Sequence, residues 1–142
     1  MRELPTNSGA GLAVEVRLES EPKIQFEHAS LVWYGDDDNY AGLFVEALGG
    51  KTKLQMVVEA AGKPQFAVAH GDAKFVWLRL VIVGDEITGQ FRESVKTEWQ
   101  PVGRMKLPAA PKFRAGLTSG GGVKGGEREV RFSEFRILRV EK

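Results

Sequence analysis

The stretch Phe26–Glu46, FEHASLVWYGDDDNYAGLFVE, contains two apolar runs on either side of an acidic cluster. Leu31 and Trp33 stand two positions apart before the cluster, and Leu43 and Val45 do so after it. Because neighbouring side chains of a β-strand point to opposite faces, this period of two predicts two strands, each with one apolar face. Asp, Asn and Gly favour turns because they tolerate unusual backbone angles. The stretch therefore predicts an antiparallel hairpin that turns at the acidic cluster.

The same alternation recurs along most of the chain, and helical periodicity is almost absent. Glycine-containing turns are predicted at Val83–Ile87 and Leu48–Leu54. The apolar phase slips between Phe132 and Phe135, which predicts a β-bulge at Ser133–Glu134. About nine or ten short strands in this pattern are typical of an antiparallel β-sandwich. The predicted strands cover residues 14–18, 28–34, 42–47, 54–59, 66–70, 76–83, 87–92, 113–119 and 130–140.

Length and composition are those of one globular domain. The chain has 142 residues, of which 42% are apolar and 27% charged, a balance typical of such domains. We expect a single β-sandwich over residues 12–142, with residues 1–11 as a flexible N-terminus or a trimmed edge. There is no cysteine, so a disulfide framework and a thiolate zinc site are excluded. The N-terminus has no long apolar run, so neither a secretory signal nor a membrane span is expected, and the compartment stays open.

Charge is unevenly distributed between the two halves of the chain. Residues 1–71 carry 6 basic and 10 acidic groups, a net −4, and residues 72–142 carry 14 and 9, a net +5. A nucleic-acid-binding protein usually has a denser basic stripe and a pI higher than 8.0. The charges are expected to cover outward strand faces, and neither nucleic acid nor a membrane is an expected partner.

Several motifs, in their order, resemble concanavalin A-like β-sandwich domains of the bacterial DUF1349 type. The opening stretch is similar to that family's "AGL-apolar-Y-D-D-x-N-Y" hairpin, with Ala29–Leu31 at the A-G-L positions and Asp37–Tyr40 at the turn. WLRLVIVGDEITGQFRES (Trp77–Ser94) resembles its second hairpin. FRAGLTSGGG (Phe113–Gly122) and VRFSEFRIL (Val130–Leu138) resemble its closing strands. The resemblance implies a jelly-roll sandwich over nearly the whole chain.

Two departures from the family pattern matter. After the second hairpin the family usually has "S-x-D-G-x-x-W", whereas this chain has the shorter SVKTEW (Ser94–Trp99) without the Asp-Gly pair. The family often carries further N-terminal strands, so this chain is either a short member or one with a trimmed edge.

Paired carboxylates suited to glycoside hydrolysis are not evident. Such enzymes place two carboxylates about 5–10 Å apart across the scissile bond. Glu127 and Glu129 share a strand face, but they adjoin a glycine-rich loop and several arginines. Neither a nucleophile elbow nor a nucleophilic cysteine is present. We therefore predict no catalytic residue, and a glycoside hydrolase is the third alternative for function.

A polar sheet face is the predicted binding site. If Tyr34 pairs with Tyr40, His28 falls opposite Glu46, and the next hairpin brings Gln55 beside Glu46. Aromatic rings stack on sugar faces and planar polar groups bind hydroxyls, so a mixed face suits a glycan. Hairpin pairing is expected to bring seven residues into two neighbouring rows: Trp77, Arg79, His28, Glu46, Gln55, Gln90 and Arg92.

Trp77 and Arg79 are the expected anchors of this binding face. The alternative is a solvated outer face in which Trp77 and Arg92 form a cation–π pair. The leading functional hypothesis is accordingly a non-catalytic carbohydrate- or ligand-binding module, with a glycan as partner. The alternative is a structural or protein-interaction domain without a small-molecule site.

The acidic cluster is predicted to form a β-turn and to have no catalytic role. Asp38 and Asn39 are expected to cap backbone N–H groups inside the turn, while Asp36 and Asp37 face water. No cofactor is expected. A calcium site at Asp36, Asp37 and Asp38 is the alternative, and it would need further oxygen ligands from another loop because the EF-hand spacing is absent.

Overall fold

The computed structural model describes residues 2–3, 11–19, 27–71, 77–120 and 130–140. Every regular element in these ranges is a β-strand, and none of them contains a helix that could span a membrane. The strands are β1 (Arg2–Glu3), β2 (Gly11–Glu19), β3 (His28–Asp36), β4 (Asn39–Leu48), β5 (Lys51–Ala60), β6 (Lys63–Gly71), β7 (Trp77–Val83), β8 (Glu86–Arg92), β9 (Gln100–Lys106), β10 (Arg114–Gly120) and β11 (Arg131–Val140).

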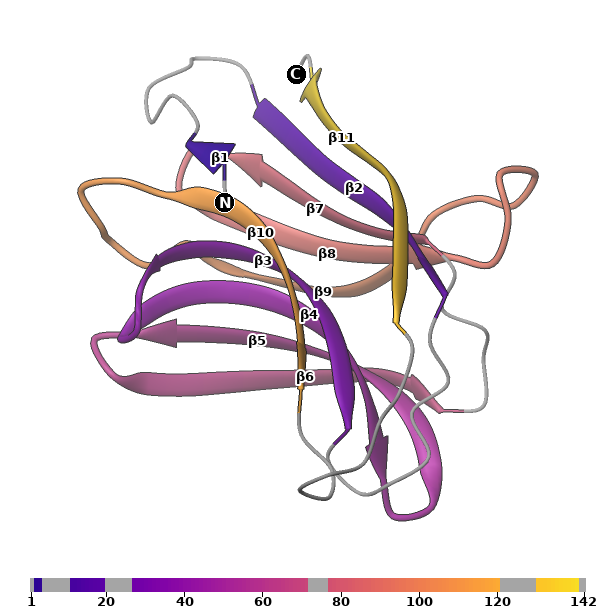
Figure 1. Cartoon of the computed structure of the whole chain (residues 1–142). Coiled ribbons are helices and arrows are strands. Elements are labelled where there is room, and N and C mark those ends of the chain that lie inside the picture. The colour runs from indigo at the N-terminus through magenta and orange to yellow at the C-terminus, as the bar shows by residue number, and fades with distance from the viewer. Residues whose placement is uncertain (1, 4–10, 20–26, 72–76, 121–129, 141–142) are drawn as a thin grey trace.

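The strands form two antiparallel sheets that pack face to face (Figure 1). Sheet A has the order β1-β10-β3-β4-β5-β6, and sheet B has the order β11-β2-β7-β8-β9. This architecture confirms the predicted all-β sandwich. Residues 4–10 lie outside the described ranges, so the expectation of a flexible or trimmed N-terminus stays a prediction.

All nine predicted strands are present, and the sequence pattern missed β1 and β9. β9 runs along an edge of sheet B and contains Pro101 and Gly103, both of which are unfavourable within a strand. Its side chains are mostly exposed or half-buried, so it lacks the apolar alternation that identifies the other strands. The bulge predicted at Ser133–Glu134 is confirmed by a register shift in β11 and by a left-handed φ of 52° at Glu134.

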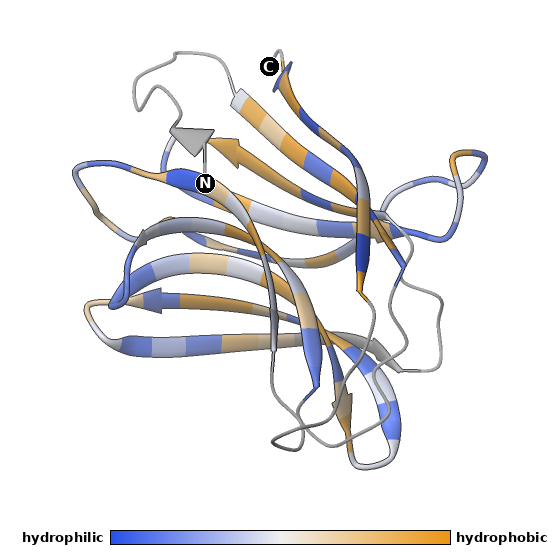
Figure 2. Ribbon diagram, in the orientation of Figure 1, coloured by the Kyte–Doolittle hydropathy of each residue, from blue (hydrophilic) through white to orange (hydrophobic). Residues whose placement is uncertain are grey.

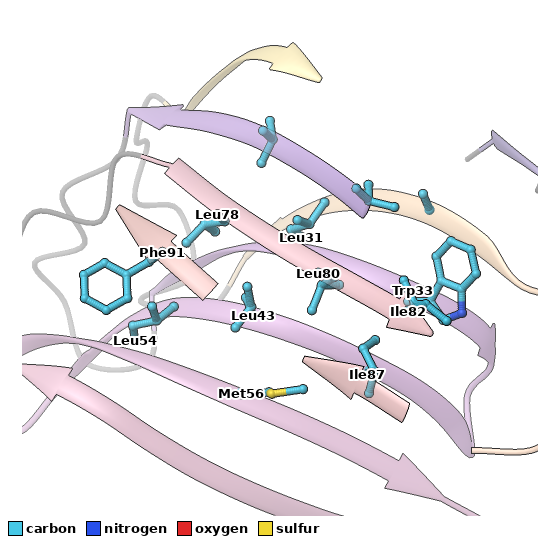
Figure 3. Packing of buried hydrophobic residues seen from close by; sticks show 14 of the residues in the cluster. Leu31, Trp33, Leu43, Leu54, Met56, Leu78, Leu80, Ile82, Ile87 and Phe91 are labelled. Carbon is cyan, nitrogen blue, oxygen red and sulfur yellow. The ribbon is translucent and has the colours of Figure 1, made fainter. Parts of the chain in front are cut away.

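The core lies between the sheets and consists of the apolar alternate positions. Hydropathy bands alternate along β2 and β11 in Figure 2, as the period-two pattern of their sequences predicts. Side chains from both sheets meet in the centre of the core (Figure 3). Leu31, Trp33, Leu43 and Val45, the apolar positions of the first hairpin, are all buried. The alternate apolar positions of the neighbouring strands are buried as well: Leu54, Met56, Val58, Leu78, Leu80, Ile82, Ile87 and Phe91.

Two core-facing glycines let the sheets approach each other closely. A Cβ atom added at Gly89 of β8 would lie 2.7 Å from Cδ2 of Leu43 and 3.0 Å from Sδ of Met56. One added at Gly103 of β9 would lie 3.0 Å from Cβ of Ala67. Glycine in these strands therefore fits the tight packing of the opposite sheet rather than a turn.

The register of the β3–β4 hairpin follows the prediction, and the register of the β4–β5 hairpin does not. In β3–β4, Tyr34 pairs with Tyr40 and His28 with Glu46, as expected. In β4–β5, however, Glu46 pairs with Lys53, so Gln55 lies opposite Phe44 and not beside Glu46. The turn is a two-residue loop at Gly49–Gly50, both with positive φ (61° and 78°), which shifts the pairing by two residues. Because the shift is even, every side chain keeps its predicted face.

The turn between β5 and β6 forces an alanine into the left-handed region. Ala61 and Gly62 have φ angles of 51° and 76°, as a two-residue hairpin of the primed type requires. A left-handed alanine costs about 1–2 kcal/mol. Glycine removes that cost but loses about 0.4–1 kcal/mol through the freedom of the unfolded chain. We expect Ala61→Gly to raise the free energy of unfolding in urea by roughly 0.5 kcal/mol. Gly62→Ala should lower the free energy of unfolding. A loss of stability in Ala61→Gly would contradict the inference that the left-handed backbone at Ala61 is strained.

Candidate functional site

The seven predicted binding residues lie on two opposite faces of the sandwich, which corrects the expectation of one continuous face. His28, Glu46 and Gln55 lie on β3, β4 and β5 of sheet A. The other four, Trp77, Arg79, Gln90 and Arg92, lie on β7 and β8 of sheet B. Alternation correctly predicts which side of each of these strands faces outward. It does not specify which hairpins share a sheet, and the whole core separates these two groups.

The outward side of sheet A, called the sheet A face here, is a grid of paired side chains. One row has Val32, Gly42, Val57 and Phe66 in adjacent strands. The row on one side has Tyr34, Tyr40 and Glu59, and the row on the other has Ser30, Phe44 and Gln55. His28, Glu46 and Lys53 form the next row. An apolar strip is thus flanked on both sides by hydrogen-bonding groups.

Phe44 covers the middle of the apolar strip. A Cβ atom at Gly42 would lie 2.7 Å from Cε2 of Phe44 and 3.0 Å from Cγ1 of Val32, so the missing side chain makes room for the ring. Val32 and Val57 are buried although they face outward. The His28 ring meets Phe44 edge-on, with centroids 5.6 Å apart. Phe44 was not among the predicted site residues, because the residues predicted on this sheet were the polar ones, His28, Glu46 and Gln55.

Polar groups beside Phe44 are held by local contacts. The Ser30 and Thr118 hydroxyls form a hydrogen bond across β3 and β10. Burial raises the pKa of Glu46 above that of a free glutamate, and the nearby His28 opposes this shift. Burial also raises the pKa of Tyr40, and the charge of Glu59 adds to it.

Phe66 extends the apolar strip to the edge strand β6 and is exposed to solvent. Its exposed fraction is 60%, the second highest among the large apolar side chains described. Its partner across the ladder is Val57, whose side chain is buried. An exposed ring continuous with a buried apolar strip is a common feature of binding surfaces.

Trp77 on sheet B is not an exposed platform, which corrects the expected role of that ring. Its side of the strand is the predicted outward one, yet only 3% of the residue is exposed. The Arg92 guanidinium lies 5.1 Å from the ring centroid, and that of Arg136 lies 5.8 Å from it. The predicted Trp77–Arg92 cation–π pair is therefore present, and arginines cover the indole instead of leaving it open for a sugar.

A second indole, that of Trp99, extends this arrangement. The guanidiniums of Arg79 and Arg92 lie 4.2 Å and 4.3 Å from its ring centroid. Arg79 Nε donates a hydrogen bond to Gln90 Oε1 at 2.7 Å. Trp99 was not among the predicted site residues because it directly precedes β9, the strand that the sequence pattern did not predict.

Glu15 is the buried carboxylate of this face. It is 4% exposed, and its Oε1 lies 3.1 Å from Nη2 of Arg136. In the ladders Glu15 stands between Arg136 and Arg79. The sequence places Glu15 on an outward strand position but gives no sign of its burial between Arg136 and Arg79.

The acidic cluster forms a turn, as predicted, but the roles of its side chains differ from those expected. Oδ1 of Asp36 accepts hydrogen bonds from the Asp38 backbone N–H at 2.9 Å and from Nδ2 of Asn39 at 3.0 Å. Asp36, and not Asp38, therefore caps the turn. Gly35 is an additional residue in β3, which shifts the register before the turn and moves the cap to Asp36.

Asn39 caps a backbone N–H in the adjacent β5–β6 turn. Its Oδ1 accepts from the Ala61 N–H at 2.9 Å, and the Gly62 N–H donates to the Asp38 carbonyl at 3.0 Å. Tyr34 donates its hydroxyl hydrogen to Asp37, and this bond raises the pKa of Tyr34. The β5–β6 turn therefore supplies two backbone N–H donors to the acidic turn between β3 and β4. Within the described ranges, no group of three or more acidic or histidine side chains is arranged to hold a metal ion.

Asp36→Ala is expected to lower the free energy of unfolding by about 1 kcal/mol, because it removes the acceptor of two hydrogen bonds. Asp38→Ala is the matched control and should change the free energy of unfolding by less than about 0.5 kcal/mol. Chemical denaturation of both variants measures the difference. Equal losses of stability in the two variants, or a larger loss in Asp38→Ala, would support the sequence-based prediction that Asp38 caps the turn.

The two-sheet sandwich with an apolar core and polar outer faces is a concanavalin A-like domain. Residues 9–113 match the family of β-xylosidase C-terminal concanavalin A-like domains, and this chain belongs to that family. No curated protein sequence matches the chain.

Solved structures with the same fold include a functionally unknown protein from Saccharomyces cerevisiae, at 22% identity and a TM-score of 0.77, with 93% of this chain and 71% of that one aligned. The GH43 protein BlXynB from Bacillus licheniformis aligns at 18% identity and a TM-score of 0.80, over 96% of this chain and 29% of that one. A xylan β-1,4-xylosidase from Bacillus halodurans aligns at 22% identity and a TM-score of 0.76, over 95% and 28%. This chain thus spans less than a third of each of these two Bacillus proteins.

Proposed function

We propose that this chain is a non-catalytic carbohydrate-binding module whose binding site is the sheet A face. The observation that carries the proposal is the apolar strip from Val32 to the exposed Phe66, with Phe44 at its centre. Apolar rings bind the C–H faces of sugars, and flanking polar groups bind hydroxyls. On this face the flanking groups are Gln55, Glu46 and His28.

The sheet A face suits a neutral sugar chain better than a charged ligand. Its charges include both signs: Glu46 pairs with Lys53 in one row, and Glu59 lies in the row at the other end of the face. Burial already disfavours the charged form of Glu46. The family is named for β-xylosidases, so xylo-oligosaccharides are the first ligands to test. The finer resemblance to bacterial DUF1349-type domains, and with it a bacterial origin, stays a prediction.

Titration calorimetry with xylohexaose, preceded by a glycan array, tests the binding proposal. Phe66→Ala and Gln55→Ala should each weaken binding by about tenfold, since losing one good contact costs around 1.4 kcal/mol. Leu138→Ala, which removes an exposed apolar side chain from sheet B, is the matched control and should bind normally. Chelator should have no effect, because the proposed site needs no metal. Absence of binding to any neutral glycan on the array would overturn the proposal.

The proposal includes the absence of catalysis. Arginines engage several carboxylates in the described ranges: Glu15 pairs with Arg136, Glu86 with Arg104 and Glu19 with Arg17. Glu127 and Glu129 lie outside those ranges, so the hydrolase alternative is tested directly. We expect no turnover of chromogenic β-xylosides or α-arabinosides, and measurable turnover that Glu127→Gln abolishes would establish the hydrolase.

A protein-interaction domain is the second candidate. It is supported by the two Bacillus proteins, of which this domain covers only 28–29%, because the matching part of each adjoins a much larger part of its protein. A negative glycan array together with stable association of the domain with a larger enzyme would favour this alternative.

A further inference from the structure

The outward side of sheet B, called the sheet B face here, concentrates positive charge in two adjacent rows. The ladders place Arg136, Glu15, Arg79 and Gln90 side by side in one row. The next row has Ser133, Arg17, Trp77 and Arg92. Four guanidiniums therefore share the two rows with a single carboxylate, that of Glu15. Arg17 has a further partner, because Glu19 lies 3.8 Å from its Nη2.

Hydrogen-bond acceptors are scarce on this face. Arg79 donates to Gln90 and Arg136 pairs with Glu15. Nε of Arg92 is buried and has no hydrogen-bond partner in the described part of the chain. Each guanidinium carries five N–H donors, so four of them greatly exceed the acceptors that these carboxylates and amides supply.

The tryptophans hold the arginines in fixed positions. Arg92 lies over both Trp77 and Trp99, and Arg79 lies over Trp99. Burial lowers the pKa of Arg79, the charge of Glu15 raises it, and the charge of Arg92 lowers it further. A guanidinium stacked on an indole still presents its N–H edge for hydrogen bonding, and that edge matches the two oxygens of a carboxylate. Such fixed donors bind an anion without first losing side-chain freedom.

We propose that the sheet B face binds the carboxylate groups of an acidic polysaccharide through Arg79, Arg92 and Arg17. This inference rests on the proposed function in assuming a glycan ligand, but it concerns the opposite face of the sandwich from the neutral-sugar site. The indoles beside the guanidiniums provide apolar contact for sugar C–H groups, which a bare cluster of cations does not. The module then has one face for neutral sugars and one for sugar acids.

Titration with oligogalacturonate at low salt is the direct test, and fully methyl-esterified oligogalacturonate is the neutral comparison. Binding to the acid should be at least tenfold tighter than to the ester and should weaken with added salt, as expected for charge pairing. Arg92→Gln should weaken binding about tenfold. Arg17→Gln, in which a more exposed arginine is replaced, should do the same with little risk to folding. Arg104→Gln, whose side chain pairs with Glu86 on the same sheet, is the matched control and should bind normally.

Three results would overturn the inference: no binding of oligogalacturonate, equal binding of acid and ester, or unchanged binding in both Arg17→Gln and Arg92→Gln. If a non-sugar polyanion such as polyglutamate bound as tightly as oligogalacturonate, the sheet B face would recognise negative charge alone and not an acidic sugar. Phe66→Ala separates this inference from the proposed function, because it should impair xylohexaose binding and leave oligogalacturonate binding unchanged. If the protein binds xylohexaose but not oligogalacturonate, only the inference for the sheet B face is refuted.

Discussion

Replacing Trp77 by alanine is expected to lower the free energy of unfolding by about 3–5 kcal/mol, as for other buried aromatic residues. The indole is almost fully buried although it faces away from the main core, and it lies beneath the guanidiniums of Arg92 and Arg136. Its removal would create a cavity and also take away the ring against which two cations pack. Urea denaturation followed by circular dichroism measures the loss.

Two control variants distinguish packing from charge at this position. Trp77→Phe keeps an aromatic face for the arginines and should cost less than half as much as Trp77→Ala. Arg104→Gln leaves the ladder of arginines and tryptophans intact and should stay near the parent protein. A Trp77→Ala variant with unchanged stability would mean that the ring is exposed in solution, and the ligand-platform role expected from the sequence would return.

Gly89→Ala is expected to cost about 1–3 kcal/mol through overpacking. The new methyl group would meet Leu43 at 2.7 Å and Met56 at 3.0 Å, and both belong to the opposite sheet. Since interiors are closely packed, the sheets would have to separate locally or side chains leave their preferred rotamers. Chemical denaturation of the single variant gives the cost.

A double-mutant cycle tests the cause of that cost. Leu43→Ala alone should destabilise by about 2–5 kcal/mol. Combined with Gly89→Ala, the total should be clearly smaller than the sum, because the new methyl group fills space that the leucine vacated. Additive effects would indicate that strain in β8, rather than contact between the sheets, limits substitution at Gly89.

Local features of the fold could be predicted because they depend on neighbouring residues. The faces of β3, β4, β7 and β8 follow from alternation, and the bulge in β11 follows from a single slip of the apolar phase. The β4–β5 register could not be predicted, because LGGKTKL allows turns of different length and only the φ angles at Gly49–Gly50 decide between them.

The candidate site was harder to predict because it depends on long-range arrangement. Alternation predicts that Trp77 and Gln55 face outward, but the sheet order that separates them depends on pairing between distant segments. Glu15 and Arg136 meet only because β2 and β11 pair across more than a hundred residues. Phe66 is conspicuous only once its strand is known to form an edge.

The two edge strands of sheet B have consequences for solubility. The edge of a β-sheet is a template for strands of other molecules, and natural proteins interrupt it. β9 contains Pro101, which has no amide hydrogen to donate, and a register shift lies beside it. At the opposite edge, β11 is interrupted by the bulge around Glu134. We therefore expect neither edge to support continuous pairing with a second chain, so sheet B resists growth into aggregates despite its high strand content.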